Sequence, residues 1–445
     1  MHVLEQNDVS HSTRDGLNSY ARIGEEIKFD QNIFDSYCYD GWQSIHHDLL
    51  VLSAAIEAAD RRWARSAHRW SRKLRVRVPV IELSKWQDSK ITQQLAATLR
   101  HLTGDQWTFD FYQWEGEATQ NKRQRPLFPN EDKTFALAYS EGLDSRCVTG
   151  LLNKDNSAVC VRVSKHKDRP KDGERPFDRL PFEVVVDPSA EDSVRSRGFK
   201  FAVITAIAAH LSNVSRIVVP ESGQGALGTV LCPLFGVYPD YRNHPTFFRR
   251  MEKFINAVLG AEITYEQPRL WFTKGETIAA YLAEGAEPSH ILSTRSCWQQ
   301  RHNVRIRGKL GQCGICAACL LRRMSIHAAK IDDLGEGYSV ADLKVATLGD
   351  AVAQQDGFQP TRTLSEFGYM GARHLHQLAE LAQASDKVLR PYVVELAASL
   401  GQAEAGIHAK LRRLLHLHAE EWFAFTNAAG EQSFLNTWTM GGRNG

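Results

Sequence analysis

Four cysteines are concentrated in one stretch of the sequence: Cys297, Cys313, Cys316 and Cys319 lie in the run SCWQQRHNVRIRGKLGQCGICAACLLRR. Two overlapping C-x-x-C steps with a fourth cysteine upstream are typical of a tetrahedral four-thiolate metal site, and Gly314 frees the backbone for the sharp turn. Zn²⁺ is the expected occupant, because four soft thiolates with no open position suit a closed structural site. An iron–sulfur cluster would use the same ligands, and reduced structural cysteines or disulfides are a third alternative.

A second candidate site is the hexapeptide Ser140-Glu141-Gly142-Leu143-Asp144-Ser145, which follows the apolar run FALAY (135–139). A strand that runs into a Ser/Gly turn and then a helix presents backbone N–H groups and a positive dipole end to an anion. The serine hydroxyls add donors, and Asp144 can hold Mg²⁺ between phosphates. Taken alone, the segment could also be an ordinary Asp/Ser helix cap.

The surrounding elements favour the phosphate interpretation. A helical pattern at 197–211 alternates with four short apolar strands, at 135–139, 158–163, 182–187 and 216–221. This alternation predicts an α/β fold with a parallel sheet covered by helices on both faces. The first βα turn of such a sheet is where a phosphate site is expected, and the hexapeptide occupies that turn.

The flanking regions have other patterns. Residues 1–30 are polar and aperiodic, so we expect a flexible arm or an edge segment there. Residues 31–125 combine helical and alternating stretches, which predicts an α+β module, and a Pro-rich charged linker is expected at 121–133. Strand patterns end near residue 330, so we expect an α/β domain over 130–330 and a helical region over 331–445.

Composition indicates a soluble globular protein. The chain has 445 residues, 43% of them hydrophobic and 24% charged, and a formal net charge of +2. It contains no apolar run of membrane-spanning length and no signal-peptide core, and its other cysteines (Cys38, Cys147, Cys160, Cys232) are scattered. We therefore expect a cytoplasmic protein without a membrane partner. The small net charge gives no indication of nucleic-acid binding.

In this context residues from about 135 to 326 resemble the PP-loop ATP pyrophosphatases, whose fingerprint is SGGxDS. Within them the sequence is similar to the QueC-like 7-cyano-7-deazaguanine synthases of queuosine biosynthesis. Four motifs occur in the family's order: SEGLDS (140–145), VYPDYRNHPTFF (237–248), FTKGET (272–277) and CGICAACLLRR. The resemblance implies a sheet of the PP-loop ATPase type (HUP, adenine nucleotide alpha-hydrolase-like).

The resemblance also implies a reaction. Enzymes of this family convert the carboxylate of 7-carboxy-7-deazaguanine to a nitrile with ammonia and ATP. A carboxylate is a poor electrophile, so ATP adenylates it with release of pyrophosphate, and an amine then displaces AMP; catalysis is chiefly positioning and charge neutralisation. An ATP-dependent ligase that forms C–N bonds is therefore expected, with ATP, Mg²⁺ and Zn²⁺ as cofactors.

Residue roles are carried over by motif. The resemblance implies that Ser140, Glu141, Gly142, Leu143, Asp144 and Ser145 bind pyrophosphate and Mg²⁺. Lys274 is implied as a point charge on phosphate or carboxylate, with Glu276 as its orienting partner, so Asp144, Lys274 and Glu276 are the expected catalytic residues. Arg195 and Arg197 could clamp phosphate or carboxylate, and Asp240 and Arg242 could bind the guanine-like ring. For each isolated charge the alternative is a surface ion pair.

The sequence departs from the family in two ways. Glu141 stands where the family has glycine, so a carboxylate that could aid Mg²⁺ binding or reduce ATP turnover lies near the phosphates. The chain is also longer than the family's enzymes, and its layout resembles QueC-like proteins of antiphage-defence operons (the QatC and type IV CBASS kinds). For these, the resemblance implies an amine acceptor on a partner protein, such as an N-terminal glycine.

Two other functions stay open. A PP-loop enzyme that thiolates tRNA would need a reactive cysteine near the loop, and Cys147 is the nearest in sequence. A catalytically weak binding subunit that scaffolds a defence complex is the other alternative. The sequence does not fix the oligomeric state, and a homodimer is one of the assemblies left open.

Overall fold

The computed structural model describes the chain in thirteen stretches. These are residues 1–5, 18–30, 41–65, 71–116, 132–164, 178–191, 193–233, 238–299, 304–306, 309–333, 335, 337–352 and 360–440. The chain divides into two compact units: the first comprises 1–139, 152–219 and 240–267, and the second comprises 140–151, 220–239 and 268–445. Most of the expected linker at 121–133 lies outside the described residues.

The first unit contains a six-stranded sheet with the order β10-β9-β6-β7-β8-β3. Its strands are β3 (Ile27–Phe29), β6 (Phe135–Ala138), β7 (Ala158–Ser164), β8 (Asp178–Val184), β9 (Arg216–Val218) and β10 (Thr264–Glu266). Every neighbouring pair is parallel except β3 with β8, which is antiparallel. The predicted α/β fold is confirmed, although β8 begins and ends earlier in the chain than its expected range of 182–187.

The winding of this sheet reverses between β6 and β9. From β6 the chain passes through α4 (Leu143–Leu152) to β7 and β8 on one side. It then returns through α5 (Arg197–Leu211) to β9, which pairs with the other side of β6. Ligands of open α/β sheets bind beyond the carboxyl ends of the strands at such a reversal. The predicted phosphate loop directly follows β6, and Glu221 follows β9.

The N-terminal residues form a second sheet, with the order β2-β1-β4-β5. Its strands are β1 (His2–Leu4), β2 (Tyr20–Arg22), β4 (Lys73–Val80) and β5 (Gln106–Gln113). All neighbouring pairs are parallel, so the expected α+β module is corrected to an α/β arrangement. Two parallel strands that follow each other in the chain need a crossover connection between them. Here α2 (Leu83–Trp86) and α3 (Ser89–Thr103) form that crossover, because they carry the chain from the end of β4 back to the start of β5.

The described part of residues 1–30, which was expected to be a flexible arm or an edge segment, forms the strands β1, β2 and β3. The N–H of His2 donates to the carbonyl of Ser19 at 2.8 Å, and the N–H of Arg77 donates to the carbonyl of Met1 at 2.9 Å. These bonds place β1 inside the second sheet, whereas β2 and β3 are edge strands. An edge position satisfies backbone groups on one side only, so a polar, aperiodic sequence is tolerated there.

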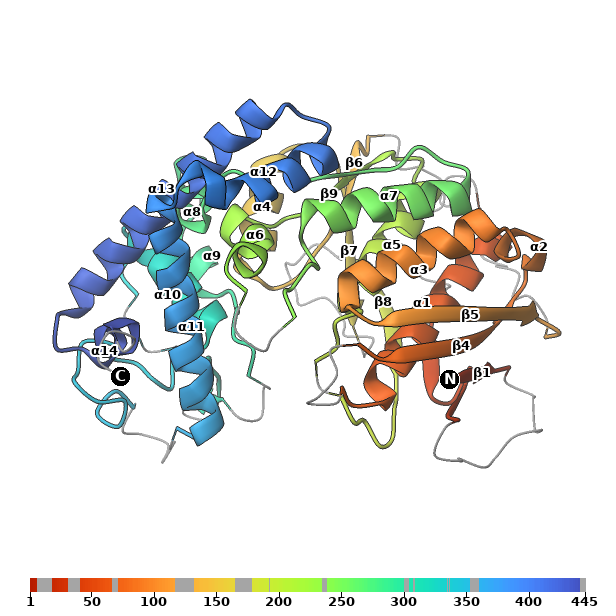
Figure 1. Cartoon of the computed structure of the whole chain (residues 1–445), viewed down its shortest axis with the longest axis horizontal. Coiled ribbons are helices and arrows are strands. Elements are labelled where there is room, and N and C mark those ends of the chain that lie inside the picture. Colours follow the sequence, from red (N-terminus) through yellow and green to blue (C-terminus); the bar gives the residue numbers. More distant parts are fainter. Residues whose placement is uncertain are drawn as a thin grey trace. The chain divides into compact units, whose positions relative to one another are not determined.

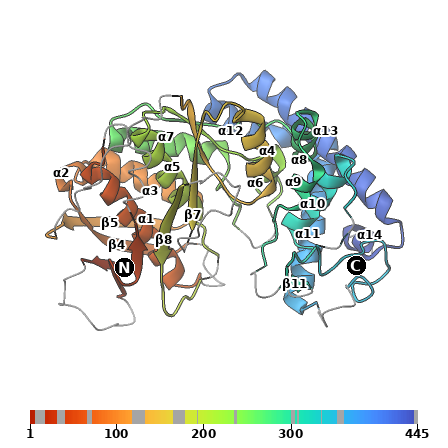
Figure 2. The same ribbon diagram turned by 180° about the vertical axis from the view of Figure 1, so that it is seen from behind.

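One hydrophobic core joins both sheets of the first unit, and it includes Val3, Val76, Ala136 and Ile217. Helices α1 (Ser44–Arg62) and α7 (Pro245–Leu259) contribute to it, and α3 and α7 run side by side in Figure 1. Figure 2 shows β7 beside β8. The N-terminal residues therefore share their core with the central sheet.

The second unit is mainly helical, as predicted for the C-terminal region. Besides α4 it contains α6 (Gly223–Leu231), α8 (Lys274–Ala283), α9 (Pro288–Leu292), α10 (Ala317–Ala328), α11 (Arg362–Glu380), α12 (Asp386–Leu400), α13 (Glu404–Ala429), α14 (Phe434–Met440), and the short strands β11 (Arg305–Ile306) and β12 (Lys309–Leu310). The long α13 packs against α10, α11 and α12 (Figure 1). Its Trp422 is fully buried. Across the described residues, no helix has the length and apolar character that crossing a membrane requires.

Candidate functional site

The predicted phosphate loop forms the turn between β6 and α4. The hydroxyl oxygens of Ser140 and Ser145 are 3.0 Å apart, and the N–H of Gly142 donates to Ser140 Oγ at 3.2 Å. Leu143 is buried against Cys147 and Ile278, whereas Ser140 and Glu141 are exposed. The apolar residue thus anchors the start of α4, and the solvent side of the turn carries a hydroxyl and a helix N-terminus, a combination that suits an anion.

Lys274 lies beside this loop, as the resemblance implied. Its ammonium group forms an ion pair with Asp144, and it lies 3.8 Å from Glu221 Oε1. Burial alone would lower the pKa of Lys274, but the carboxylates of Asp144 and Glu221 outweigh this effect and raise it, so Lys274 stays charged. The segments that follow β6 and β9 therefore meet at one buried lysine. Sequence analysis did not identify Glu221, because nothing in its local spacing distinguishes it.

Asp144 has capacity for a further partner. Its Oδ2 accepts from Lys274, while its Oδ1 is buried and has no hydrogen-bond partner among the described residues. A buried carboxylate oxygen without a donor is a suitable ligand for a hard divalent cation. The chemistry of this donor therefore fits Mg²⁺, which would bring positive charge to phosphate oxygens at the loop; Asp144 would hold it.

Glu276 has different partners from those expected. Its carboxylate accepts the N–H of Thr273 at 2.9 Å and pairs with Arg413 of α13, while its own N–H donates to Thr273 Oγ1 at 3.0 Å. This reciprocal pair is a capping box that starts α8. Asp144 and Glu221, rather than Glu276, are the carboxylates beside the Lys274 side chain. The expected orienting role of Glu276 is therefore corrected to a capping role, by which it fixes the helix that carries Lys274.

Arg195, Arg197, Asp240 and Arg242 gather in the first unit, around the start of α5. Arg242 Nε donates to Asp240 Oδ1 at 2.8 Å, and the side chain of Arg242 packs over Gly198, where a Cβ would lie 3.0 Å from its Cγ. Burial would raise the pKa of Asp240, but its bonds with Arg242 and the charge of Arg195 lower it. The structure thus brings these four predicted residues together, and their roles toward a substrate stay predictions.

Arg195 also belongs to a buried ion network. Its Nη1 donates to the carbonyl of Thr103 at 3.0 Å, and the adjacent N–H of Ser196 donates to Asp60 Oδ2 at 2.8 Å. Asp60 and Asp105 are fully buried, and Arg65 and Arg72 each bridge both carboxylates. The network fixes the segment that precedes α5.

Replacing Asp60 by alanine should destabilise the first unit by about 3–5 kcal/mol, because the buried guanidinium groups of Arg65 and Arg72 would each lose one carboxylate, and Arg72 would keep Asp105 alone. Urea unfolding followed by circular dichroism measures the effect. Asp110→Ala is the control, since that carboxylate is half exposed in a surface ion pair and its loss should cost less than about 1 kcal/mol. Equal destabilisation by the two changes would contradict the structural role of the network.

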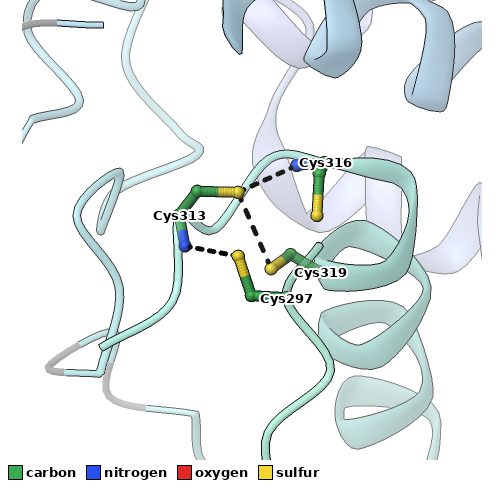
Figure 3. Close-up of side chains that lie close together, drawn as sticks. All are labelled: Cys297, Cys313, Cys316 and Cys319. Atoms are coloured by element: carbon green, nitrogen blue, oxygen red, sulfur yellow. Dashed lines mark hydrogen bonds between the residues drawn. The ribbon is translucent and has the colours of Figure 1, made fainter. Parts of the chain in front are cut away.

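The four predicted metal-binding cysteines converge in the second unit (Figure 3). Their sulfurs all lie within 4.8 Å of one another, and all four residues are buried. Cys316 caps α10, Cys319 lies in its first turn, and Cys297 approaches from the segment after α9. Backbone N–H groups point at the sulfurs: that of Cys313 donates to Cys297 Sγ at 3.2 Å, and that of Cys316 donates to Cys313 Sγ at 3.3 Å.

The surroundings of these sulfurs fit a structural zinc ion. Gly314 has a φ of +88°, and a Cβ there would lie 2.4 Å from the carbonyl oxygen of Val340, which bears out the expectation that this turn needs glycine. Burial, followed by the neighbouring sulfurs, raises the pKa of Cys319 well above its usual value. Four thiolates so placed need a divalent cation to balance their charge, and Zn²⁺ would be held by all four.

Two arginines that sequence analysis missed hold the cysteine segment in place. Arg322 is buried and donates to Thr294 Oγ1 at 2.5 Å, to the carbonyl of Ile291 at 3.1 Å and to the Tyr338 hydroxyl at 3.0 Å. Arg323 donates to the carbonyl of Val340 at 3.0 Å. These bonds tie both sides of the cysteine turn to α10. Both arginines are visible in the motif CLLRR, but two adjacent arginines usually lie on a solvated surface, so the sequence did not indicate that they are buried.

The cysteine region also contacts the phosphate loop. The N–H of Arg295 donates to the carbonyl of Glu141 at 3.2 Å, two residues before Cys297. In addition, α10, which contains Cys319, packs against α8, which begins with Lys274. A metal held by the cysteines would thus stabilise both the backbone of Glu141 and the helix that carries Lys274.

Comparison with known families identifies one relationship. The family model of the queuosine biosynthesis protein QueC matches residues 225–330. The matched range contains Lys274, Glu276 and all four cysteines, but not the loop at 140–145. No curated protein matches the chain.

The match supports a QueC-like character for this part of the chain. QueC proteins are ATP-dependent enzymes with the PP-loop ATPase fold, and the parallel sheet with flanking helices agrees with that fold. The matched domain suggests an ATP-using role like that of 7-cyano-7-deazaguanine synthases.

Proposed function

We propose that the protein adenylates the carboxylate of a 7-deazaguanine, such as 7-carboxy-7-deazaguanine, and transfers the acyl group to an amine. One observation carries this proposal: the start of α4, at a loop resembling the PP-loop, and Lys274, inside the QueC-matched range, form one buried cluster. Nothing in the sequence around the loop or around Lys274 requires that the two lie close together in the fold. Their meeting at Asp144 supports a shared role in handling phosphate.

In this proposal each residue of the cluster helps to hold or neutralise the negative charge of the phosphates. The carboxylate oxygen attacks the α-phosphorus of ATP, and the bond to pyrophosphate breaks. Ser140, Gly142 and Ser145 would hold the departing pyrophosphate at the helix N-terminus, Asp144 would hold Mg²⁺, and Lys274 would balance the negative charge. An amine nitrogen then forms a bond to the acyl carbon while the bond to AMP breaks, which leaves an amide.

The amine acceptor decides the product. With ammonia, the primary amide must lose a second oxygen to become the nitrile, so a second activation is needed. With an amine on a protein, such as an N-terminal glycine, the reaction ends at an amide that joins the deazapurine to that protein. The long layout favours the second outcome, which is that of the antiphage-defence proteins the sequence resembles.

The tRNA-thiolation alternative requires a reactive thiol near the loop. Cys147 is fully buried, and burial raises its pKa to about 12, with Asp144 adding to the shift. A thiol in this environment is protonated at neutral pH and is a poor sulfur carrier. The geometry therefore favours adenylation and amide formation.

Product analysis tests the proposal and separates the acceptors. Purified protein is incubated with ATP, Mg²⁺ and 7-carboxy-7-deazaguanine, with ammonium in one reaction and a glycine-initiated peptide in the other, and both are examined by mass spectrometry. The proposal expects AMP together with a peptide amide. Free nitrile without peptide modification would remove the protein-conjugation version. Absence of AMP in both reactions would favour the catalytically weak scaffold.

A further inference from the structure

We propose that Glu421, on α13, is a positioning residue for Lys274. Its carboxylate holds the start of α8 and the bridging Gln224 in the arrangement that presents Lys274 to the phosphate loop. This inference rests on the proposed function for its catalytic consequence only. Glu421 lies outside the QueC-matched range of 225–330, so the helical C-terminal region would complete the site of the matched part.

The backbone of Lys274 is held by a side chain of α6. Lys274 is the first residue of α8, and its N–H is one of the helix's unpaired donors. It donates to Gln224 Oε1 at 2.7 Å. Gln224 lies in the first turn of α6, just after Glu221, which flanks the Lys274 ammonium group. The amide of Gln224 thus ties the segment after β9 to the lysine.

The carboxylate of Glu421 accepts hydrogen bonds from the two residues that hold the backbone of Lys274. Its Oε1 accepts from Thr273 Oγ1 at 2.5 Å, and its Oε2 accepts from Gln224 Nε2 at 3.2 Å. Thr273 is the residue that caps α8, and it is fully buried. One carboxylate therefore fixes both residues that flank the backbone of Lys274: its capping neighbour and its hydrogen-bond acceptor.

His418, one turn earlier on α13, completes the network. Gln224 Nε2 lies 3.0 Å from His418 Nδ1, and His418 Nε2 lies 2.9 Å from the carbonyl of Leu375. Burial lowers the pKa of His418 to about 4, so the ring is neutral, donates through Nε2 and accepts at Nδ1. This leaves Gln224 one orientation, with its carbonyl oxygen facing Lys274.

Close packing shows that α13 is fitted to this point. A Cβ on Gly275 would lie 2.5 Å from Glu421 Oε1 and 2.9 Å from the Cβ of Ala328. A Cβ on Gly223 would lie 2.5 Å from Leu414 Cδ2. The two glycines sit at the starts of α8 and α6, the helices that carry Lys274 and Gln224. Their missing side chains allow α13 to reach the backbone at both places.

The role of Glu421 depends on two oxygens that both accept hydrogen bonds. Burial raises its pKa to about 7, the bonds from Thr273 and Gln224 lower it, and the charges of Glu276 and Glu420 raise it. Near neutral pH both protonation states are populated. Thr273 Oγ1 and Gln224 Nε2 both donate to Glu421, so a glutamine of the same shape keeps an acceptor for only one of them, whereas alanine removes both.

The test compares Glu421→Ala with Glu421→Gln and with Glu420→Ala, which removes an exposed carboxylate from the neighbouring position on the same helix. First, without ATP, the acetylation rate of Lys274 by acetic anhydride is measured by mass spectrometry. The loss of buried hydrogen bonds in Glu421→Ala should raise this rate about tenfold. Glu421→Gln should give an intermediate rate, and Glu420→Ala should match the wild type.

Second, carboxylate-dependent AMP formation is measured. Glu421→Ala should lower kcat about 10- to 100-fold while KM for ATP changes by less than about threefold, since misplacement of a catalytic group acts mainly on the transition state. Glu421→Gln, which keeps one of the two acceptors, should recover only part of the lost kcat, and Glu420→Ala should keep the wild-type value. Wild-type labelling and kinetics in Glu421→Ala would overturn the inference.

A second variant and a readout that does not need activity complete the experiment. If Glu421→Ala fails to fold, Gln224→Met replaces it, because that change removes the bridge without altering α13, and the same results are expected. If the wild type forms no AMP, the proposed function fails, but the labelling experiment still decides whether Glu421 positions Lys274.

Discussion

Replacing Cys316 by serine should abolish Zn²⁺ binding and unfold the region around α10. Four buried sulfurs within 4.8 Å of one another have no other stable arrangement as thiolates, and a serine hydroxyl does not replace a soft anionic ligand. Structural zinc contributes apparent binding free energies of about 10–16 kcal/mol in small domains. The loss of one ligand should therefore lower the stability of the fold around the site. Activity should fall as a consequence, because α10 packs against α8 and the same region donates to the loop carbonyl of Glu141.

Metal content by mass spectrometry and thermal unfolding by circular dichroism measure this effect. Cys232→Ser is the control, because Cys232 is also a buried cysteine of the second unit but is not one of the four ligands. It should retain one metal ion per chain. A Cys316→Ser protein with wild-type metal content and melting temperature would contradict the four-thiolate site. Iron in place of zinc would support the cluster alternative.

Replacing Lys274 by methionine should lower carboxylate-dependent AMP formation by about 10²–10³-fold, the loss typical of one preorganised charge or donor. Stability should also fall, by about 3–5 kcal/mol, because Asp144 would remain buried without its cation. Initial rates and urea unfolding measure the two quantities separately.

The double variant Asp144→Asn with Lys274→Met separates catalysis from folding. It removes both charges of the buried pair, so most of the lost stability should return. Activity should stay as low as in the single variant, because both the cation ligand and the point charge are gone. Recovery of activity together with stability would show that the pair is structural only.

Local patterns in the sequence predicted the parts of the site that local geometry determines. A strand, a Ser/Gly turn and a helix occur consecutively, so the loop at 140–145 could be placed without knowing the rest of the fold. The C-x-x-C steps likewise fix how Cys313, Cys316 and Cys319 converge. The start of α5 at Arg197 was predicted correctly for the same reason, since its helical period is visible in the residues themselves.

Long-range partners could not be predicted in this way. Glu276 meets Arg413, which is 137 residues away in the chain, and Thr273 meets Glu421, which is 148 residues away. In the sequence, none of these four residues differs from the many other charged and polar residues of the helices, so their pairing cannot be predicted. The parallel pairing of β4 with β5 was missed for a related reason: alternation identifies a strand but not the direction of its neighbour.

Exchange of labelled pyrophosphate into ATP tests the central claim most directly, because it needs no knowledge of the amine acceptor. The reaction contains the protein, ATP, Mg²⁺, labelled pyrophosphate and 7-carboxy-7-deazaguanine. If the loop at 140–145 and Lys274 adenylate the carboxylate, label should enter ATP only when the carboxylate is present, and Asp144→Asn should reduce the rate by about 10²-fold or more. No exchange, exchange without the carboxylate, or a wild-type rate in Asp144→Asn would contradict the account.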